Sequence, residues 1–342
     1  MQRAPSASLL RNFDTYSPRL WLRFEREQVG SIRCTVKNAS QAYCAYGEKP
    51  GTRRQHMQLR SITGDVTGRP TIDGAGVRLV RVLGSPTVKT FDPFLMLDAF
   101  DSVNPEDYVK GFPMHPHRGI ETFTYLVNGV IEHKDSLGNA GVIRDGGCQW
   151  MTAGSGILHQ EMPLASPRML GLQLWINLPA AHKMTDPKYR DITIDMVPCV
   201  EEEAAYVTVV AGEYKGVEGA ARGDYVDVRF LDVRLKPGAR WQVETNPAHT
   251  VFAYLYAGDC FLMEGREPML ARHAYLLGDG DTVAFEGGEE ECRFVLVSGA
   301  PLREPVAWGG PIVMNTDEEL MQAYFEIEEG RFIKHWLPSA QD

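Results

Sequence analysis

The sequence predicts an all-β protein with two similar barrels in one chain and a short helix near its C-terminal end. Three observations support this fold class. Short apolar stretches recur at roughly 8–12-residue spacing with turn residues between them, which is typical of β-sandwiches and barrels. A second copy of the pattern follows the first at an offset of about 130 residues. One late amphipathic stretch has helical periodicity.

Strand periodicity is clearest in two segments of the first copy. Between Thr122 and Val127, Phe, Tyr and Val alternate with Thr, Thr and Leu; between Leu172 and Asn177, Leu, Leu and Ile alternate with Gln, Trp and Asn. Side chains of a strand alternate between its two faces, so both segments are expected to be strands. Asn128-Gly129 follows the first segment and is a strong signal for a hairpin turn.

The second copy supports the prediction of two barrels. The sequence pattern of Val251–Gly258 is similar to that of Thr122–Gly129. The pattern of Leu277–Phe285 is similar to that of Ile143–Met151, and both of these segments are expected to form a strand, a Gly-rich turn and a second strand. The offset is too long for a solenoid, whose repeats are shorter. Two barrels of similar design are the expected result.

Proline and charge patterns suggest the domain boundaries. A proline-containing segment near residues 178–200 is expected to connect an N-terminal barrel at 57–190 with a C-terminal barrel at 191–342. The helix is expected from Thr316 to Glu329, because Thr316 is a good N-cap and acidic residues follow it.

The first 56 residues differ from the rest of the chain. They contain ten Lys and Arg against four Asp and Glu, a formal charge of about +6, whereas the remainder carries about -16. No apolar core of a secretory signal follows the basic start. We interpret the extension as a translated upstream segment with Met57 as the true start; a disordered tail and an organellar targeting peptide are the alternatives, in that order. Disorder is expected in all three cases.

Composition excludes several classes of protein. A hydrophobic fraction of 44% with 23% charged residues is ordinary for a soluble globular chain. No apolar run is long enough for a transmembrane helix, and a net charge of -10 argues against a general nucleic-acid surface. The six cysteines form no C-x-x-C pair, which favours reduced thiols in a cytoplasmic protein. Cys148 is expected to be a small buried hydrophobe.

Two pairs of side chains predict a metal site. His115 and His117 are two residues apart, as are His159 and Glu161. Residues at this spacing on a strand point to the same face, so two neighbouring strands would bring three imidazoles and one carboxylate together. Such a set suits iron, nickel, manganese, copper or zinc. The lack of thiolate ligands favours a centre with open coordination positions over a closed structural zinc site.

Less specific interpretations compete with this one. A single histidine is more often a hydrogen-bonded core or surface residue than a ligand, so the prediction depends on the pairing. Glu121 is the main rival to Glu161, because it lies on the same face as His115 and His117 if that strand stays regular.

The segments around these residues resemble the pirin family of bicupin metalloproteins. The resemblance runs from about Met57 to about Arg331 and includes Asn315-Thr316 with Glu318-Glu319; its most specific segments are Phe91–Asp98, His115–Thr122 and Gln149–Pro163. It implies two cupin-type barrels (double-stranded β-helix, or jelly roll) with one metal in the first, for which Fe(II) is the expected ion. The metal ligands that it implies are His115, His117, His159 and Glu161, and the context favours Glu161 over Glu121.

The second barrel is expected to lack a matching ligand set. It has His249 alone in the corresponding strand region, and Cys292-Arg293-Phe294 where the first has His159-Gln160-Glu161. Its expected role is to cover or shape the first barrel.

The resemblance also implies an activity. Several members are similar to quercetin 2,3-dioxygenases, which suggests oxygen-dependent cleavage of a flavonol with Glu161 as general base. The alternative is a non-enzymatic, iron-dependent regulatory protein that binds a protein partner. Five apolar residues next to the ligands are candidates for a substrate pocket, although ordinary barrel core is the simpler interpretation for each: Phe112, Met114, Phe123, Trp150 and Met151. Arg118 is expected either to steady an anionic ligand or a neighbouring carboxylate, or to be an exposed charge beside a strand turn, and the sequence favours neither.

Overall fold

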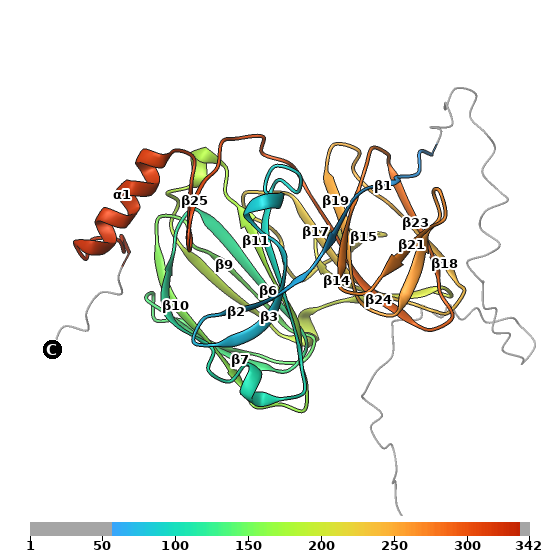
Figure 1. The fold of residues 1–342 in the computed structure, drawn as a ribbon, viewed down its shortest axis with the longest axis horizontal. Coiled ribbons are helices and arrows are strands. Elements are labelled where there is room, and N and C mark those ends of the chain that lie inside the picture. Colours follow the sequence, from blue (N-terminus) through green and yellow to red (C-terminus); the bar gives the residue numbers. More distant parts are fainter. Residues whose placement is uncertain (1–56, 336–342) are drawn as a thin grey trace, which may run out of the picture. The chain divides into compact units, whose positions relative to one another are not determined.

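A computed structural model describes residues 57–335 and confirms the all-β prediction (Figure 1). The only α-helix within this range is α1 (Asp317–Glu328), which Thr316 caps as predicted by accepting a hydrogen bond from the Glu319 amide. No helix in the described range is long and apolar enough to cross a membrane. The expectations for residues 1–56 lie outside the described residues.

The N-terminal barrel consists of a seven-stranded and a four-stranded sheet. The strand order of the larger sheet is β12-β9-β6-β11-β4-β3-β2, and that of the smaller is β5-β10-β7-β8. The bounds are β2 (Arg69–Asp73), β3 (Val77–Leu83), β4 (Phe94–Ser102), β5 (Phe112–His117), β6 (Ile120–Asn128), β7 (Val130–Asp135), β8 (Ala140–Ile143), β9 (Cys148–Thr152), β10 (Ile157–Leu164), β11 (Met169–Asn177) and β12 (Lys188–Ile192).

The C-terminal barrel repeats this arrangement. Its sheets have the orders β1-β22-β19-β24-β17-β14-β13 and β18-β23-β20-β21. The bounds are β1 (Ile62–Thr67), β13 (Cys199–Glu201), β14 (Ala205–Ala211), β17 (Val228–Leu235), β18 (Arg240–Glu244), β19 (Thr250–Ala257), β20 (Asp259–Leu262), β21 (Glu267–Leu270), β22 (His273–Leu277), β23 (Thr282–Gly287) and β24 (Cys292–Gly299).

Short elements complete the fold. Two small hairpins pair β15 (Glu213–Tyr214) with β16 (Val217–Glu218), and β25 (Ala307–Gly309) with β26 (Ile312–Met314). Single turns of 3-10 helix occur at Ser85–Thr87, Pro105–Asp107, Ala180–His182 and Ile194–Met196.

Strand order corrects part of the repeat alignment. β19 occupies the same position in its sheet as β6 does in the first barrel, as the similarity of Val251–Gly258 to Thr122–Gly129 predicts. Leu277–Phe285, however, spans β22 and β23, which match β9 and β10 and not Ile143–Met151. Cys292 likewise begins β24, the counterpart of β11, so the strand that corresponds to His159–Glu161 is β23. Strand–turn–strand segments look alike throughout an antiparallel barrel, and their pattern therefore does not say which hairpin they form.

Each barrel is completed by the opposite end of the chain. β1 pairs with β22 at the edge of the C-terminal barrel, the position that β12 takes beside β9 in the first barrel. At the other end, Ile312 forms a parallel bridge with Arg118 of the N-terminal barrel. The expected division into domains at 57–190 and 191–342 stays a prediction. Backbone pairing joins the two ranges twice, between β1 and β22 and between Arg118 and Ile312.

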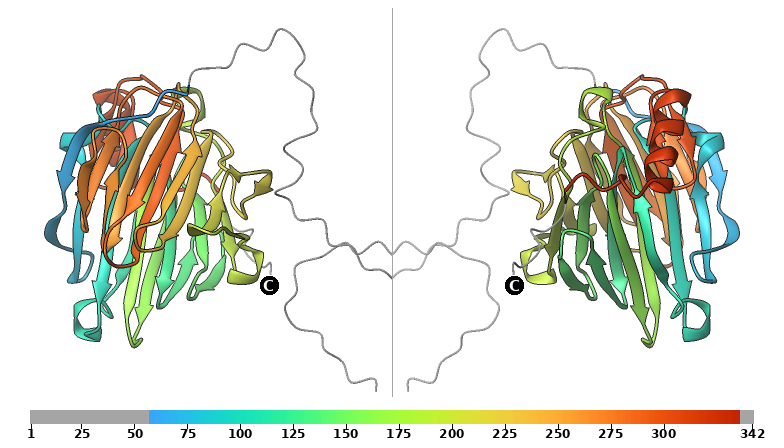
Figure 2. Two further views of the ribbon diagram at one scale, coloured as in Figure 1. Left: turned by 90° about the vertical axis from the view of Figure 1, so that its right-hand side faces the viewer. Right: turned by 90° about the vertical axis from the view of Figure 1, so that its left-hand side faces the viewer.

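The largest core lies between the two seven-stranded sheets, one from each barrel. Figure 2 shows the C-terminal barrel in front in its left view and the N-terminal barrel in front in its right view. The rings of Phe123 and Phe230, one from each sheet, are 5.0 Å apart, and Phe252 contacts Phe94 at 5.3 Å. Strands β6 and β11 are buried on both faces, because one face lines the barrel and the other meets the second sheet. Cys148 is buried in this core, as expected.

Candidate metal centre

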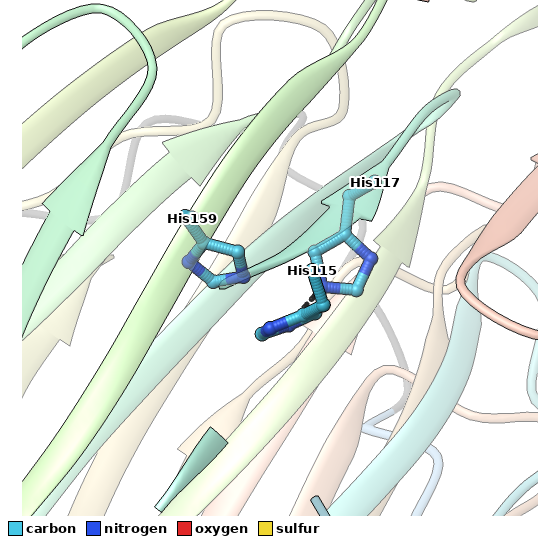
Figure 3. Close-up of side chains that lie close together, drawn as sticks. All are labelled: His115, His117 and His159. Atoms are coloured by element: carbon cyan, nitrogen blue, oxygen red, sulfur yellow. Dashed lines mark hydrogen bonds between the residues drawn. The ribbon is translucent and has the colours of Figure 1, made fainter. Parts of the chain in front are cut away.

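The structure brings three of the four predicted ligands together. β5 and β10 are antiparallel neighbours, and His115 lies opposite His159. The ring centroids of His159 are 4.4 Å from His115 and 5.0 Å from His117, and ligand nitrogens of all three lie within 4.8 Å of one another (Figure 3). Among the described residues no second group of this kind occurs.

Backbone carbonyls orient two of these imidazoles. Nδ1 of His115 is 2.8 Å from the carbonyl oxygen of Pro113, and Nδ1 of His117 is 3.0 Å from that of Pro311. A carbonyl oxygen only accepts, so both Nδ1 atoms carry the proton. The Nε2 atoms of the two rings face each other at 3.1 Å and are the atoms left to bind an ion when the rings are neutral. This is the second-sphere arrangement that usually holds metal-binding histidines in place.

The charge state also suits a cation. Burial and the neighbouring His115 lower the pKa of His117 to about 3, and burial lowers the pKa of His159 well below its usual value. Both rings are therefore neutral near pH 7. His159 is fully buried, yet neither of its ring nitrogens has a hydrogen-bond partner among the described residues. A buried polar atom without a partner costs about 1–3 kcal/mol, and a bound ion would offset this cost at one of the two ring nitrogens. The residues therefore fit a divalent transition metal.

Glu161 lies inside the same barrel but is engaged elsewhere. Nε2 of Gln149 donates to one carboxylate oxygen at 2.5 Å, and Nε2 of Gln173 donates to the other at 2.6 Å. Thr124 donates a third bond at 3.1 Å. The three-histidine group does not include this carboxylate. Its role as a fourth ligand stays a prediction.

The two amides were not among the predicted site residues. Gln149 is flanked by Cys148 and Trp150, and Gln173 by Leu172 and Leu174, so each is a polar residue between apolar neighbours in its strand. A buried polar side chain needs a partner. That signal could have identified both positions as part of the barrel interior.

Glu121 does not share the face of the histidines. β5 ends at His117, Gly119 turns the chain with a φ of +76°, and β6 begins in the other sheet. Glu121 consequently accepts a hydrogen bond from Thr152 at 2.7 Å on the side of Phe123, and burial raises its pKa. The expectation of a same-face position was wrong because the strand does not stay regular.

A histidine–carboxylate pair adjoins the cluster. Nε2 of His133 lies 3.2 Å from Asp135 in the interior, and the His133 ring is 5.4 Å from that of His159. Tyr189 stacks on the other side of His133 at 4.0 Å. The alternation of His133 and Asp135 in β7 is the sequence signal that could have indicated these inward positions.

The predicted pocket residues separate into different environments. Phe123 and Trp150 belong to the core between the sheets, so they do not line the cluster. Met114 is exposed, whereas Met151 is buried beside Trp175. The ring of Phe112 lies 6.5 Å from that of His115.

Arg118 is buried rather than exposed, and it donates a hydrogen bond to the carboxylate of Glu326 in α1. The aromatic residue next to the cluster is Trp175, whose ring meets His117 edge-on at 4.9 Å. Trp308 follows at 5.9 Å from Trp175.

Comparison with known proteins agrees with this architecture. The family model described as Pirin matches residues 76–176, and the one described as Pirin C-terminal cupin domain matches residues 230–333. The chain is 43% identical to a pirin-like protein of Caulobacter vibrioides over 279 residues, which cover 81% of this chain and all of the relative. The chain belongs to the pirin family.

Other pirin-family relatives come from distant organisms. A Pseudomonas aeruginosa protein, provisionally named a quercetin 2,3-dioxygenase, is 43% identical over 77% of this chain and 95% of its own length. Human pirin is 37% identical over 80% of this chain and 93% of its length. A crystal structure of quercetin 2,3-dioxygenase from Acinetobacter baumannii is 31% identical with a TM-score of 0.73, covering 80% of this chain and 98% of that one.

Proposed function

We propose that this pirin-family protein is a metal-dependent dioxygenase that cleaves flavonol-like substrates at the histidine cluster. The observation that carries the proposal is the convergence of His115, His117 and His159, of which His159 is fully buried and has no partner for either ring nitrogen in the described part of the chain. The relatives named for quercetin 2,3-dioxygenase activity support the reaction type.

The donor set indicates which ion to test first. Three imidazoles with a carboxylate nearby suit Fe(II), and nickel, manganese, copper or zinc are compatible with the same ligands. When bound, such an ion would act as a Lewis acid toward an enolic or phenolic oxygen of the substrate. Glu161 is the proposed fourth ligand, which requires one carboxylate oxygen to leave Gln149 or Gln173.

Glu161 is also the proposed proton acceptor. A flavonol reacts with dioxygen more readily after its hydroxyl proton is removed, and a carboxylate near the cluster can accept that proton. Gln149 and Gln173 would limit the positions that this carboxylate can adopt. The aromatic rings of Trp175 and Trp308 offer apolar surface beside His117 for a planar substrate.

The test is turnover of quercetin by the iron-loaded protein in the presence of oxygen. Loss of the flavonol absorbance is expected with wild-type protein and not with His117→Ala. Absence of turnover after loading with iron, nickel, manganese and copper in turn would overturn the dioxygenase and leave iron-dependent binding of a protein partner as the alternative. Equal turnover by His117→Ala would overturn the assignment of the reaction to this cluster.

A further inference from the structure

The C-terminal strap, residues Ala307–Lys334, covers the end of the strand that carries His117. The backbone amide of Val313 donates to the carbonyl of Arg118 at 3.1 Å. The buried Lys183 donates to the carbonyls of both Gly119 and Val313, at 2.8 Å and 2.9 Å. The strap is therefore fastened to the two residues that follow His117.

The strap also provides the acceptor that orients His117. The carbonyl of Pro311 lies 3.0 Å from Nδ1 of His117, although the two residues are 194 positions apart in the chain. His115 instead contacts Pro113 of its own strand. One imidazole of the cluster is thus positioned by a segment from the far end of the chain.

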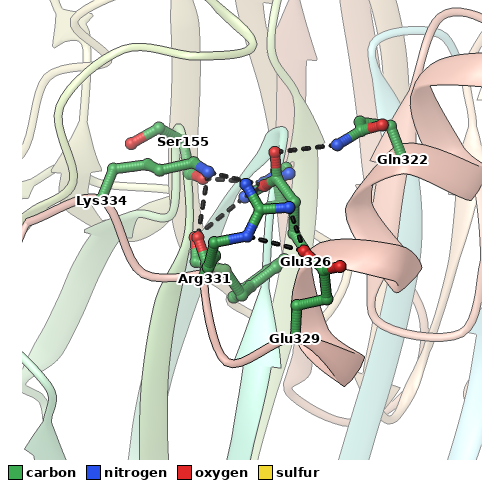
Figure 4. Close-up of polar contacts among 8 residues, drawn as sticks. Ser155, Gln322, Glu326, Glu329, Arg331 and Lys334 are labelled. Atoms are coloured by element: carbon green, nitrogen blue, oxygen red, sulfur yellow. Dashed lines mark hydrogen bonds and ion pairs between the residues drawn. The ribbon is translucent and has the colours of Figure 1, made fainter.

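The side chain of Arg118 binds the strap through hydrogen bonds and a ring contact. Its side chain is only 2% exposed, and Nε donates to the carbonyl of Ser155 at 2.7 Å. Nη2 donates to Glu326 at 2.8 Å and to the carbonyl of Phe332 at 2.9 Å, and the guanidinium stacks on the Phe332 ring. Figure 4 shows the polar contacts around Glu326, which include Gln322 and Lys334, with Ser155 close by. Removing a partner from a buried guanidinium leaves a buried charge uncompensated, which is strongly destabilising. The arrangement in which Arg118 keeps all of these partners is therefore strongly preferred.

We propose that the strap is a positioning element of the metal centre, with the Arg118–Glu326 ion pair holding Pro311 against His117. This inference rests on the proposed metal centre but not on catalysis. Arg118 directly follows His117, so a displaced strap changes both the backbone beside the ligand and the acceptor of its Nδ1 proton. Glu326 therefore acts on the metal through Arg118 and Pro311, without touching it.

The experiment compares Glu326→Ala with Glu328→Ala in the full chain. Glu328 lies on the same helix but is exposed, which makes it a matched control. Co(II) is the probe, because its visible spectrum reports ligand geometry and its affinity can be measured by chelator competition. Glu326→Ala is expected to weaken Co(II) binding about tenfold or more and to shift the spectrum; Glu328→Ala should change neither.

A second measurement separates positioning from general loss of stability. Nitrogen-15 correlations in the metal-free protein identify which ring nitrogen of His117 carries the proton. We expect Nδ1 in the wild type and a mixture of tautomers in Glu326→Ala. If that variant does not fold, Glu326→Gln serves instead, since it nearly keeps the size of the side chain but removes the charge and replaces one of the two acceptor oxygens by a donor.

The outcomes distinguish the two proposals. Wild-type affinity, spectrum and tautomer in a folded Glu326 variant would overturn the role of the strap alone. Unchanged Co(II) binding in His117→Ala would overturn the metal centre itself.

Discussion

Replacing Gly119 by Ala is expected to damage the attachment of the strap severely. Gly119 has a φ of +76°, and a Cβ added there would lie 1.9 Å from the carbonyl oxygen of Val313 and 2.9 Å from Cδ of Lys183. The first of these atoms belongs to the backbone, so it cannot move away by a side-chain rotation. The strap itself must be displaced.

The structure allows the loss of stability to be worked out. A left-handed conformation costs a residue with a Cβ about 1–2 kcal/mol. Displacing Val313 removes the hydrogen bond that it accepts from Lys183 and the one that it donates to Arg118, each worth about 1 kcal/mol. The sum is about 3–4 kcal/mol, before any change in the contact between Pro311 and His117.

Urea unfolding of Gly119→Ala and Gly238→Ala provides the assay. Gly238 has a φ of +61° with no heavy atom within 4 Å of the added Cβ, so that variant measures backbone strain alone. We expect the two free energies of unfolding to differ by about 2 kcal/mol, at similar dependence on urea concentration. Equal losses would refute the reasoning, because they would show that the strap does not press on Gly119.

Three further variants test other parts of the structure. Glu161→Gln should weaken metal binding about 10-fold or more, whereas Glu121→Gln should have little effect; the reverse order in chelator competition would give the ligand role to Glu121. Phe252→Ala, in the core between the sheets, should lower the free energy of unfolding by about 3–5 kcal/mol and leave metal content unchanged, as elemental analysis would show. Burial lowers the pKa of Lys183 to about 7, below the value of about 10 in an unfolded chain, so between these values the unfolded state binds the extra proton. Wild-type stability should accordingly rise with pH from about 7 to about 10 relative to Lys183→Met; a pH-independent difference in urea unfolding would contradict this pKa.

The approach of the three histidines was predictable from local pattern. His115 and His117 share a face of β5, and His159 lies on the facing side of its neighbour β10. Two-residue spacing is a property of any strand, so pairing two such strands is sufficient to bring the rings together.

The surroundings of these histidines depend on geometry that the local pattern does not contain. The turn at Gly119 sends Glu121 to the opposite face, and a strand pattern continues through such a turn without showing it. Pro311 reaches His117 only through the tertiary fold, since no sequence periodicity links the two positions. Phe123 and Trp150 are apolar in sequence whether they meet a ligand or a second sheet, and only the packing of the barrels distinguishes these environments.

The exchange of chain ends determines when the histidine cluster can be finished during synthesis. His115, His117 and His159 leave the ribosome early, but Pro311 follows about 150 residues after His159. At about 5–20 residues per second, the ribosome needs roughly 8–30 s to translate that interval. β1 is synthesised before all of these residues, and the interval until its pairing partner β22 is synthesised is even longer. The histidines thus exist for many seconds on a nascent chain without the carbonyl that orients His117, so the proposed metal centre can be completed only after Pro311 has been synthesised.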